Sequence, residues 1–191
     1  MKDKLKQFYK KNEVEAWYLL LGFLLIMVLF WQVIFYNKII IFGDVASDTL
    51  HNYLPNYTYY VENLRNLSLR VFDFTLGTGT SIFSMPNFLF DPGLPILLLF
   101  PKGRLVDGIF LISILKILGI GFLALKTLRF HFKGRGLVLT GSLIYAFSGY
   151  ILVWGQHFQF LINVFWFTLL LYAFERWFGD RRKKVLLITA L

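Results

Sequence analysis

The sequence of 191 residues is 57% hydrophobic and 19% aromatic, with a mean hydropathy of +0.61 and a formal net charge of +9. A soluble globular protein of this size would leave too much apolar surface in water, so lipid is the natural solvent for the chain. The absence of cysteine excludes disulfides and thiol chemistry, and because the basic residues stand between apolar runs, nucleic acid is not an expected partner.

Four apolar runs are predicted to cross a membrane as helices. They cover residues 16–36, 108–125, 137–154 and 158–174. The first run carries no charge and is long enough to cross a hydrocarbon core about 30 Å thick. A cleaved signal peptide is the alternative interpretation, but the run is too long for an ordinary signal peptide and residues 37–39 offer no small-x-small cleavage site. An uncleaved anchor is therefore expected.

The basic residues predict the orientation of these helices. Most of the 20 Lys and Arg residues lie in three segments, 1–15, 126–136 and 175–184. Since short loops rich in Lys and Arg stay in the cytoplasm, all three segments are expected there, in a multi-pass protein of the cell membrane. The long segment 37–107 and the short turn 155–157 then lie outside.

The end of the sequence begins another apolar run. Residues 185–191 are too few to complete a span. They are interpreted as the start of a truncated fifth helix, which makes the chain the N-terminal part of a longer protein. An interfacial tail is the alternative.

The outer segment 37–107 is far longer than a hairpin connection needs, and such loops are usually functional. Within it, residues 44–66 carry apolar side chains at three- and four-residue spacing, which predicts an amphipathic helix. Such a helix should lie in the membrane interface with its tyrosines at headgroup depth. Pro55 should kink this helix or start a second one.

The rest of the outer segment contains an apolar stretch that is broken by prolines. Residues 82–101 include Pro86, Pro92, Pro95 and Pro101, so no spanning helix is expected there. The stretch should pack on the bundle or dip into the outer leaflet. The predicted fold class is therefore an all-α transmembrane helix bundle with a long extracytoplasmic first loop.

Asp44, Asp48 and His51 are the first candidate site residues. On a helix both carboxylates would lie on one face, with the imidazole one turn further on. Two acids and a histidine can bind a divalent metal such as Mg²⁺ or Mn²⁺, or act as a general base. The alternative is that Asp44 caps the helix and Asp48 is only solvated.

Lys116 and His157 are candidate contacts for a phosphate. Lys116 lies near the middle of the second span, where a bare lysine costs about 2.5 to 3.5 kcal/mol, so it should face the bundle interior and a phosphate or carboxylate partner. Snorkelling is the alternative. His157, in the outer turn, is placed to join the same site, although a lone loop histidine is more often solvated.

Several of these features, taken in order, resemble the N-terminal part of the bacterial YfhO-like membrane proteins. The features are Gly43-Asp44, the helix through Tyr53, Leu54 and Pro55, the Gly77-x-Gly79 turn, Asp91-Pro92, Tyr145-Ala-Phe-Ser-Gly149, His157 and Glu175-Arg176. Members of this family are similar to the GT-C glycosyltransferases, which take sugars from polyprenyl phosphates and use an essential aspartate in the first outer loop. Some are implicated in glycosylating teichoic acids.

The resemblance implies a glycosyltransferase with a GT-C-like bundle, a polyprenyl-phosphate-linked sugar as donor and a cell-envelope polymer as acceptor. Carried over by position, Asp44 is the catalytic aspartate and Asp48 the second acid or a metal partner. The acidic pair or Asp-x-Asp of related enzymes is absent, so the resemblance does not fix metal dependence. This part of the enzyme is expected to be inactive alone. The alternative is a non-catalytic membrane protein, either a transporter of an envelope precursor or an accessory subunit.

Overall fold

The protein is an all-α membrane helix bundle, and the described part of the long loop between the first two expected spans packs on one end of it. The computed structural model describes residues 12–36, 38–40, 48–74, 79–84 and 86–180. Strand occurs in this part only as one short hairpin, in which β1 (Phe72–Asp73) pairs antiparallel with β2 (Thr80–Ser81). The predicted fold class is confirmed.

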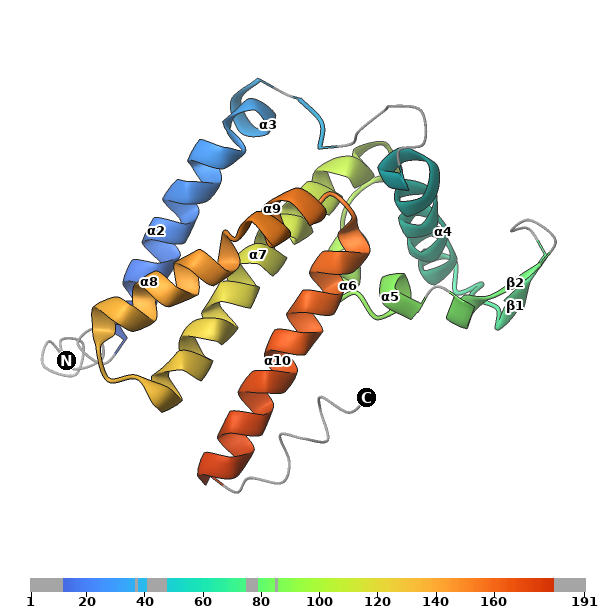
Figure 1. The fold of residues 1–191 in the computed structure, drawn as a ribbon. Helices are drawn as coiled ribbons and strands as arrows, with labels where there is room; N and C mark the ends of the chain where they lie inside the picture. Colours follow the sequence, from blue (N-terminus) through green and yellow to red (C-terminus); the bar gives the residue numbers. More distant parts are fainter. Residues whose placement is uncertain (1–11, 37, 41–47, 75–78, 85, 181–191) are drawn as a thin grey trace, which may run out of the picture.

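Three helical units form the centre of the bundle and lie side by side (Figure 1). Among the described residues these three are long and apolar enough to cross a membrane, and they correspond to the expected second, third and fourth spans. Their helices are α7 (Leu105–His131), α8 (Arg135–Ala146), α9 (Gly149–Trp154) and α10 (Phe158–Asp180). Phe147 and Ser148 interrupt the middle unit, and the Ser148 hydroxyl caps α9 by accepting from the Ile151 N–H at 3.5 Å.

The expected first span consists of two helices. α2 (Glu13–Leu29) has 17 residues and is separated by Phe30 from the short α3 (Trp31–Phe35). α2 packs on α7 and α8, and side chains of all three helices meet at Gly121. There the Tyr18 hydroxyl donates to the Leu118 carbonyl at 2.9 Å, and a Cβ added to Gly121 would lie 2.5 Å from the Cβ of Ala146. Only glycine fits this contact.

At the end of the bundle where the N-terminus lies, acidic residues of α2 bind cations of the α7–α8 connection. Glu15 is buried and pairs with Lys126 at 2.6 Å and with Arg129. Glu13 pairs with Arg135 at 2.7 Å. These ion pairs join two of the segments that the sequence assigns to the cytoplasm.

In the outer loop the predicted amphipathic helix is present from Asp48 onward. A π-helical turn (Thr49–Tyr53) leads into α4 (Leu54–Arg65). Pro55 stands in the first turn of α4, where its missing N–H costs least. The helix does not break at this proline but changes from π to α geometry at Leu54, one residue before it. The predicted start of the helix, at 44, lies outside the described residues.

The tyrosines of this helix are covered by protein, and the expectation that they lie at the depth of lipid headgroups stays a prediction. Tyr53, Tyr57 and Tyr60 are almost completely buried by protein, in a cluster that includes Ile109 of α7 and Phe158 of α10. Their hydroxyls find partners inside the protein, as the site below details. The spacing of a helical stripe shows that one face is covered, but it does not distinguish lipid from protein as the cover.

The proline-broken stretch packs on the bundle, as predicted. It contains a 3₁₀ turn (Ile82–Ser84), α5 (Pro86–Leu89), α6 (Leu94–Leu97) and a second 3₁₀ turn (Lys102–Arg104) that leads into α7. Arg65 at the end of α4 donates to the carbonyls of Leu97 at 3.2 Å and Leu98 at 3.1 Å. The guanidinium thereby satisfies backbone acceptors that follow α6.

Labelling of single cysteines tests the predicted orientation, because the native chain has no cysteine. Ser68, after α4, is exposed, and Gly134, between α7 and α8, has room for a side chain. Ser68→Cys is expected to react with a membrane-impermeant maleimide in intact cells, whereas Gly134→Cys should react only after lysis. The reverse pattern would contradict the orientation.

Candidate functional site

The first polar group of the site, the outer junction, consists of Asp48, Tyr53 and His157. His157 lies in the turn between α9 and α10, while Asp48 and Tyr53 flank the π-helical turn of the outer loop. His157 Nδ1 lies 3.1 Å from the Tyr53 hydroxyl and 3.7 Å from an Asp48 carboxylate oxygen. A third contact joins the same segments, since the Thr49 hydroxyl donates to the Gln156 carbonyl at 3.4 Å.

Aromatic rings hold the His157 imidazole in place. The Trp154 ring lies 5.6 Å away at a shallow angle of 34°, and Tyr53 and Phe160 each present an edge-to-face contact at 5.8 Å. Burial, and secondly the Asp48 carboxylate, raise the pKa of the Tyr53 hydroxyl, which therefore keeps its proton at neutral pH. When this hydroxyl donates to Nδ1, the neutral imidazole carries its proton on Nε2 and presents a donor to an anion.

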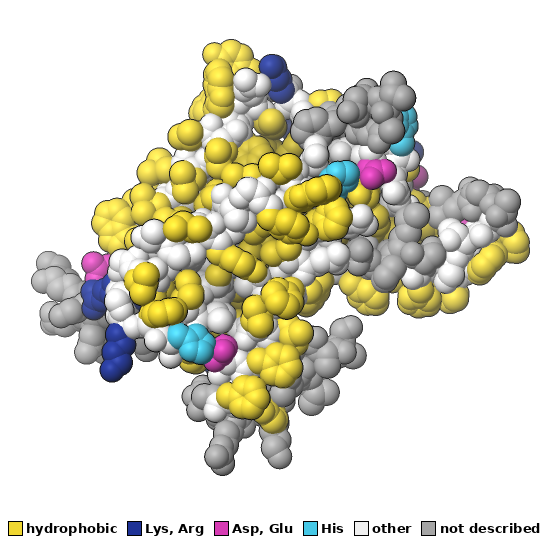
Figure 2. All heavy atoms as spheres, viewed as in Figure 1, with side chains coloured by type: hydrophobic (Ala, Val, Ile, Leu, Met, Phe, Trp, Pro, Cys, Tyr) yellow, Lys and Arg dark blue, Asp and Glu magenta, His cyan; other side chains and the backbone are white. Residues whose placement is uncertain are grey.

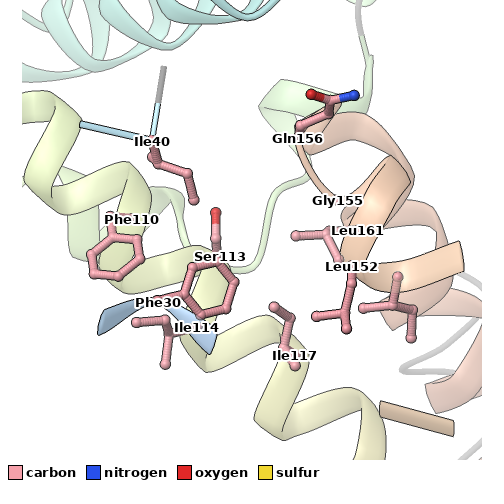
Figure 3. Close-up of a pocket in the computed structure, with 11 residues that line it drawn as sticks. Phe30, Ile40, Phe110, Ser113, Ile114, Ile117, Leu152, Gly155, Gln156 and Leu161 are labelled. Atoms are coloured by element: carbon pink, nitrogen blue, oxygen red, sulfur yellow. The ribbon is translucent and has the colours of Figure 1, made fainter. Parts of the chain in front are cut away.

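An apolar cavity of about 70 Å³ adjoins this turn (Figure 3). Phe30, Ile40 and side chains of α7, α9 and α10 line it, with Gly155 and Gln156 from the turn itself. Ser113 also lines the cavity, but its hydroxyl donates a hydrogen bond to the Ile109 carbonyl at 2.8 Å. The recess therefore suits a piece of hydrocarbon, and it is smaller than the roughly 300 to 1,000 Å³ of a pocket for a whole ligand.

The second polar group, the buried node, consists of Tyr57, Asp91 and Lys116. Lys116 Nζ lies 2.8 Å from Asp91 Oδ2 and 3.4 Å from the Tyr57 hydroxyl, which itself donates to Asp91 Oδ2. The other carboxylate oxygen of Asp91 accepts from the Gly93 N–H at 2.8 Å. The exposed fractions are 3% for Lys116, 3% for Asp91 and 0% for Tyr57. The node therefore ties α4, the α5–α6 connection and α7 together.

The charges of the node satisfy each other. A buried ion pair is tolerated only when hydrogen bonds occupy its remaining donors and acceptors, and Asp91 receives three such bonds. Burial, followed by the neighbouring Asp91 charge, raises the pKa of Tyr57 well above its ordinary value, so the phenol remains a donor. The node is therefore suited to holding structure together.

The prediction that Lys116 faces the bundle interior is confirmed, and its partner is a carboxylate. His157 does not share this partner. Lys116 contacts Tyr57 and Asp91, whereas His157 contacts Tyr53 and Asp48, so the two candidate phosphate contacts belong to different groups. The link between the groups is the helix that carries Tyr53 and Tyr57 one turn apart.

The remaining candidates are only partly placed. Asp44 lies outside the described residues, so its role stays a prediction. Asp48 and His51 are both exposed, and the recorded partner of Asp48 is His157. In the part of the chain that the structure describes, no group of three or more His, Asp or Glu side chains could hold a metal ion.

Asp91 is the site residue that the sequence reasoning missed. It belongs to the Asp91-Pro92 pair of the family resemblance, which implies no role for it. A signal was nevertheless present, because Asp91 is the single charged residue between 82 and 101, as Lys116 is within its own span. Two lone opposite charges in apolar segments are expected to pair, because each is costly without the other.

Comparison with known proteins gives one match. A family model described as bacterial membrane protein YfhO matches residues 21–191. No curated protein and no solved structure matches the chain.

Proposed function

The chain belongs to the YfhO family of bacterial membrane proteins, and we propose that it is a membrane glycosyltransferase that moves a sugar from a polyprenyl phosphate to a cell-envelope polymer such as teichoic acid. The observation that supports this best is the position of the outer junction at the apolar cavity. A lipid-linked sugar needs a place for hydrocarbon directly beside polar groups for its phosphate. Gln156 lines the cavity, and His157 follows it in the same turn.

The candidate catalytic aspartate, Asp44, belongs to a segment whose described neighbours both lie at this place. Ile40 lines the cavity, and an Asp48 carboxylate oxygen lies 3.7 Å from His157 Nδ1. Residues 41–47 join these two positions. This connection supports Asp44 as a residue of the same site.

The proposed reaction uses a carboxylate as general base. Asp44 takes the proton of an acceptor hydroxyl, whose oxygen then forms a bond to the anomeric carbon of the sugar. The bond between that carbon and the phosphate oxygen breaks, and the phosphate leaves on its lipid with the bonding electrons. His157 Nε2–H is positioned to donate to this departing phosphate. Lys116 is not assigned to the phosphate, because Asp91 already occupies it.

Replacement of Asp44 tests this proposal in the full-length protein. Asp44→Asn keeps the shape of the side chain and removes the proton acceptor, so sugar transfer is expected to fall at least about a hundredfold while the protein still accumulates in the membrane. Transfer of radiolabelled sugar from the polyprenyl phosphate to the polymer measures the effect. Asp48→Asn, the matched control, should lower transfer less.

Other results of these two substitutions would point to a different role for Asp44. If Asp44 only caps a helix, Asn will replace it almost silently, because Asn and Asp cap equally well. Substantial transfer by a folded Asp44→Asn protein would remove this residue from the mechanism. If Asp44 and Asp48 share Mg²⁺ or Mn²⁺, both substitutions should lower transfer together, and added divalent metal should partly restore the milder variant.

A non-catalytic role, as a transporter of an envelope precursor or as an accessory subunit, is the second candidate. Two observations favour it: the interruption between α8 and α9, and the Lys116–Asp91 pair in the middle of the bundle. Transporters often combine broken helices with charges at mid-membrane. Here the two charges neutralise each other, which leaves neither free for a substrate. In reconstituted vesicles, a transporter would move the lipid-linked precursor across the vesicle membrane without transferring its sugar.

A further inference from the structure

The hairpin and the stretch that follows it carry exposed phenylalanines, here called the phenylalanine face. Its members are Phe72, Phe74, Phe83 and Phe90, and the most exposed is Phe74 at 76%. Phe72 in β1 and Phe74 just after it lie on the same side of the hairpin, because their rings make a T-shaped contact at 5.0 Å and both lie against Gly79. Figure 2 shows hydrophobic side chains along the underside of the hairpin and of the neighbouring segment.

The polar side of the hairpin is held against the protein. Asp73, between the two phenylalanines, is buried and accepts from the Tyr59 hydroxyl at 2.7 Å. The Ile82 carbonyl, just after β2, accepts from the Tyr60 hydroxyl at 2.8 Å. These two contacts to α4 fix which side of the hairpin faces outward, so the exposure of the phenylalanines follows from the fold.

Charge is missing from the outward side. Between Arg70 and Lys102 the sequence has two charged residues, Asp73 and Asp91, and both turn inward to tyrosine hydroxyls. A surface facing water would normally carry charges among its apolar residues. This arrangement is typical of a surface that faces hydrocarbon, where charges are costly.

Contacts with the spanning helices place this segment at membrane depth. The Phe90 carbonyl accepts from the indole of Trp166, which lies just over two turns, roughly 12 Å, into α10. Asp91 binds Lys116, which lies about three turns, roughly 16 Å, into α7. Phe90 of the phenylalanine face therefore lies against α10, and the hairpin extends sideways from the bundle (Figure 1).

We propose that the phenylalanine face inserts among the acyl chains of the membrane leaflet that borders the long loop. The hairpin is then a lipid-anchored arm that extends sideways from the bundle and fixes the outer loop at a constant depth. Aromatic side chains are well suited to this region of a bilayer. The inference does not depend on which reaction, if any, the protein catalyses.

A fluorescent label in reconstituted vesicles tests this. The chain has no cysteine, so an NBD dye can be attached to Phe74→Cys alone, in full-length protein in vesicles of phosphatidylcholine and phosphatidylglycerol. The control is Gly103→Cys, at an open position between the exposed side chains of Lys102 and Arg104. Quenching by a lipid spin-labelled on its acyl chain should be at least about twofold stronger at position 74 than at 103, and quenching by aqueous iodide should be weaker.

Two results would overturn the proposal. Equal iodide quenching at both positions would show that the hairpin lies in water. Protection of position 74 from both quenchers, lost when the protein is diluted with lipid, would show that a second copy of the chain covers the face. Because the same dye is attached at both positions, the dye's own affinity for lipid does not affect the difference in quenching between them. If Phe74→Cys impairs folding, the dye can be attached at Phe83→Cys instead, because Phe83 is 57% exposed.

Discussion

Replacement of Lys116 by methionine is expected to lower the free energy of unfolding by about 3 to 5 kcal/mol, the usual cost of removing one partner of a buried ion pair. Methionine fills a similar volume, so the loss comes from the charge. The Asp91 carboxylate would remain buried with Tyr57 and the Gly93 N–H as its remaining partners. Thermal unfolding of the detergent-solubilised protein, followed by tryptophan fluorescence, measures the change.

The second half of this experiment removes both charges. In Lys116→Met with Asp91→Asn, the amide can still accept from the Gly93 N–H and bond to the Tyr57 hydroxyl, so most of the lost stability should return. Tyr57→Phe, which leaves the ion pair intact, should cost less, about 1 to 3 kcal/mol. If the double variant is as unstable as Lys116→Met alone, then the pairing of charges is not what the node contributes.

Gly121→Val is expected to destabilise the bundle by about 3 kcal/mol, the upper end of the usual cost of overpacking. The added side chain would overlap the Tyr18 hydroxyl of α2 and the Ala146 methyl of α8 at once, and α7 cannot move away from both. The same unfolding measurement applies. The Tyr18 hydrogen bond to the Leu118 carbonyl should also be lost.

Two further variants isolate this contact. Gly136→Val is the matched control, because Gly136 is an exposed helical glycine with open space around its Cα, and its change should stay within about 0.5 kcal/mol. Gly121→Ala combined with Ala146→Gly moves one methyl group from α8 to α7 and should be more stable than Gly121→Ala alone. Equal effects at positions 121 and 136 would show that the close helix contact does not matter.

The sequence predicts a structural feature best where one free-energy cost decides it. A lysine in an apolar run is expensive in lipid, so the inward position of Lys116 could be predicted without knowing its partner. The apolar stripe of residues 44–66 likewise predicted a helix with one covered face. Its cover could not be predicted, because the tyrosines depend on Asp91, Ile82 and His157, which come from other segments.

Features built from few residues were not predictable. The hairpin consists of strands of two residues each, too short for an alternating pattern to be visible. Of the expected Gly77-x-Gly79 turn, only Gly79 lies among the described residues, and its φ of 105° agrees with a turn that needs glycine. The break at Phe147 and Ser148 carries a weak local signal, the capping Ser148 followed by Gly149, but glycine is also common inside spanning helices. The pairing of His157 with Asp48 needed the tertiary fold.

The order of the partners of the buried node along the chain affects how the protein is made. Synthesis delivers Tyr57 and Asp91 before Lys116, and it delivers Phe158, whose ring lies 5.9 Å from that of Tyr57, later still. If the loop lies outside, as the basic residues predict, it crosses the membrane as an open segment with its aspartate hydrated, before the three spanning units α7, α8–α9 and α10 are complete. Only when α10 has entered the bilayer can the loop close onto the bundle, so a ribosome or translocation machinery that stalls before this point leaves Asp91 without its lysine or its cover.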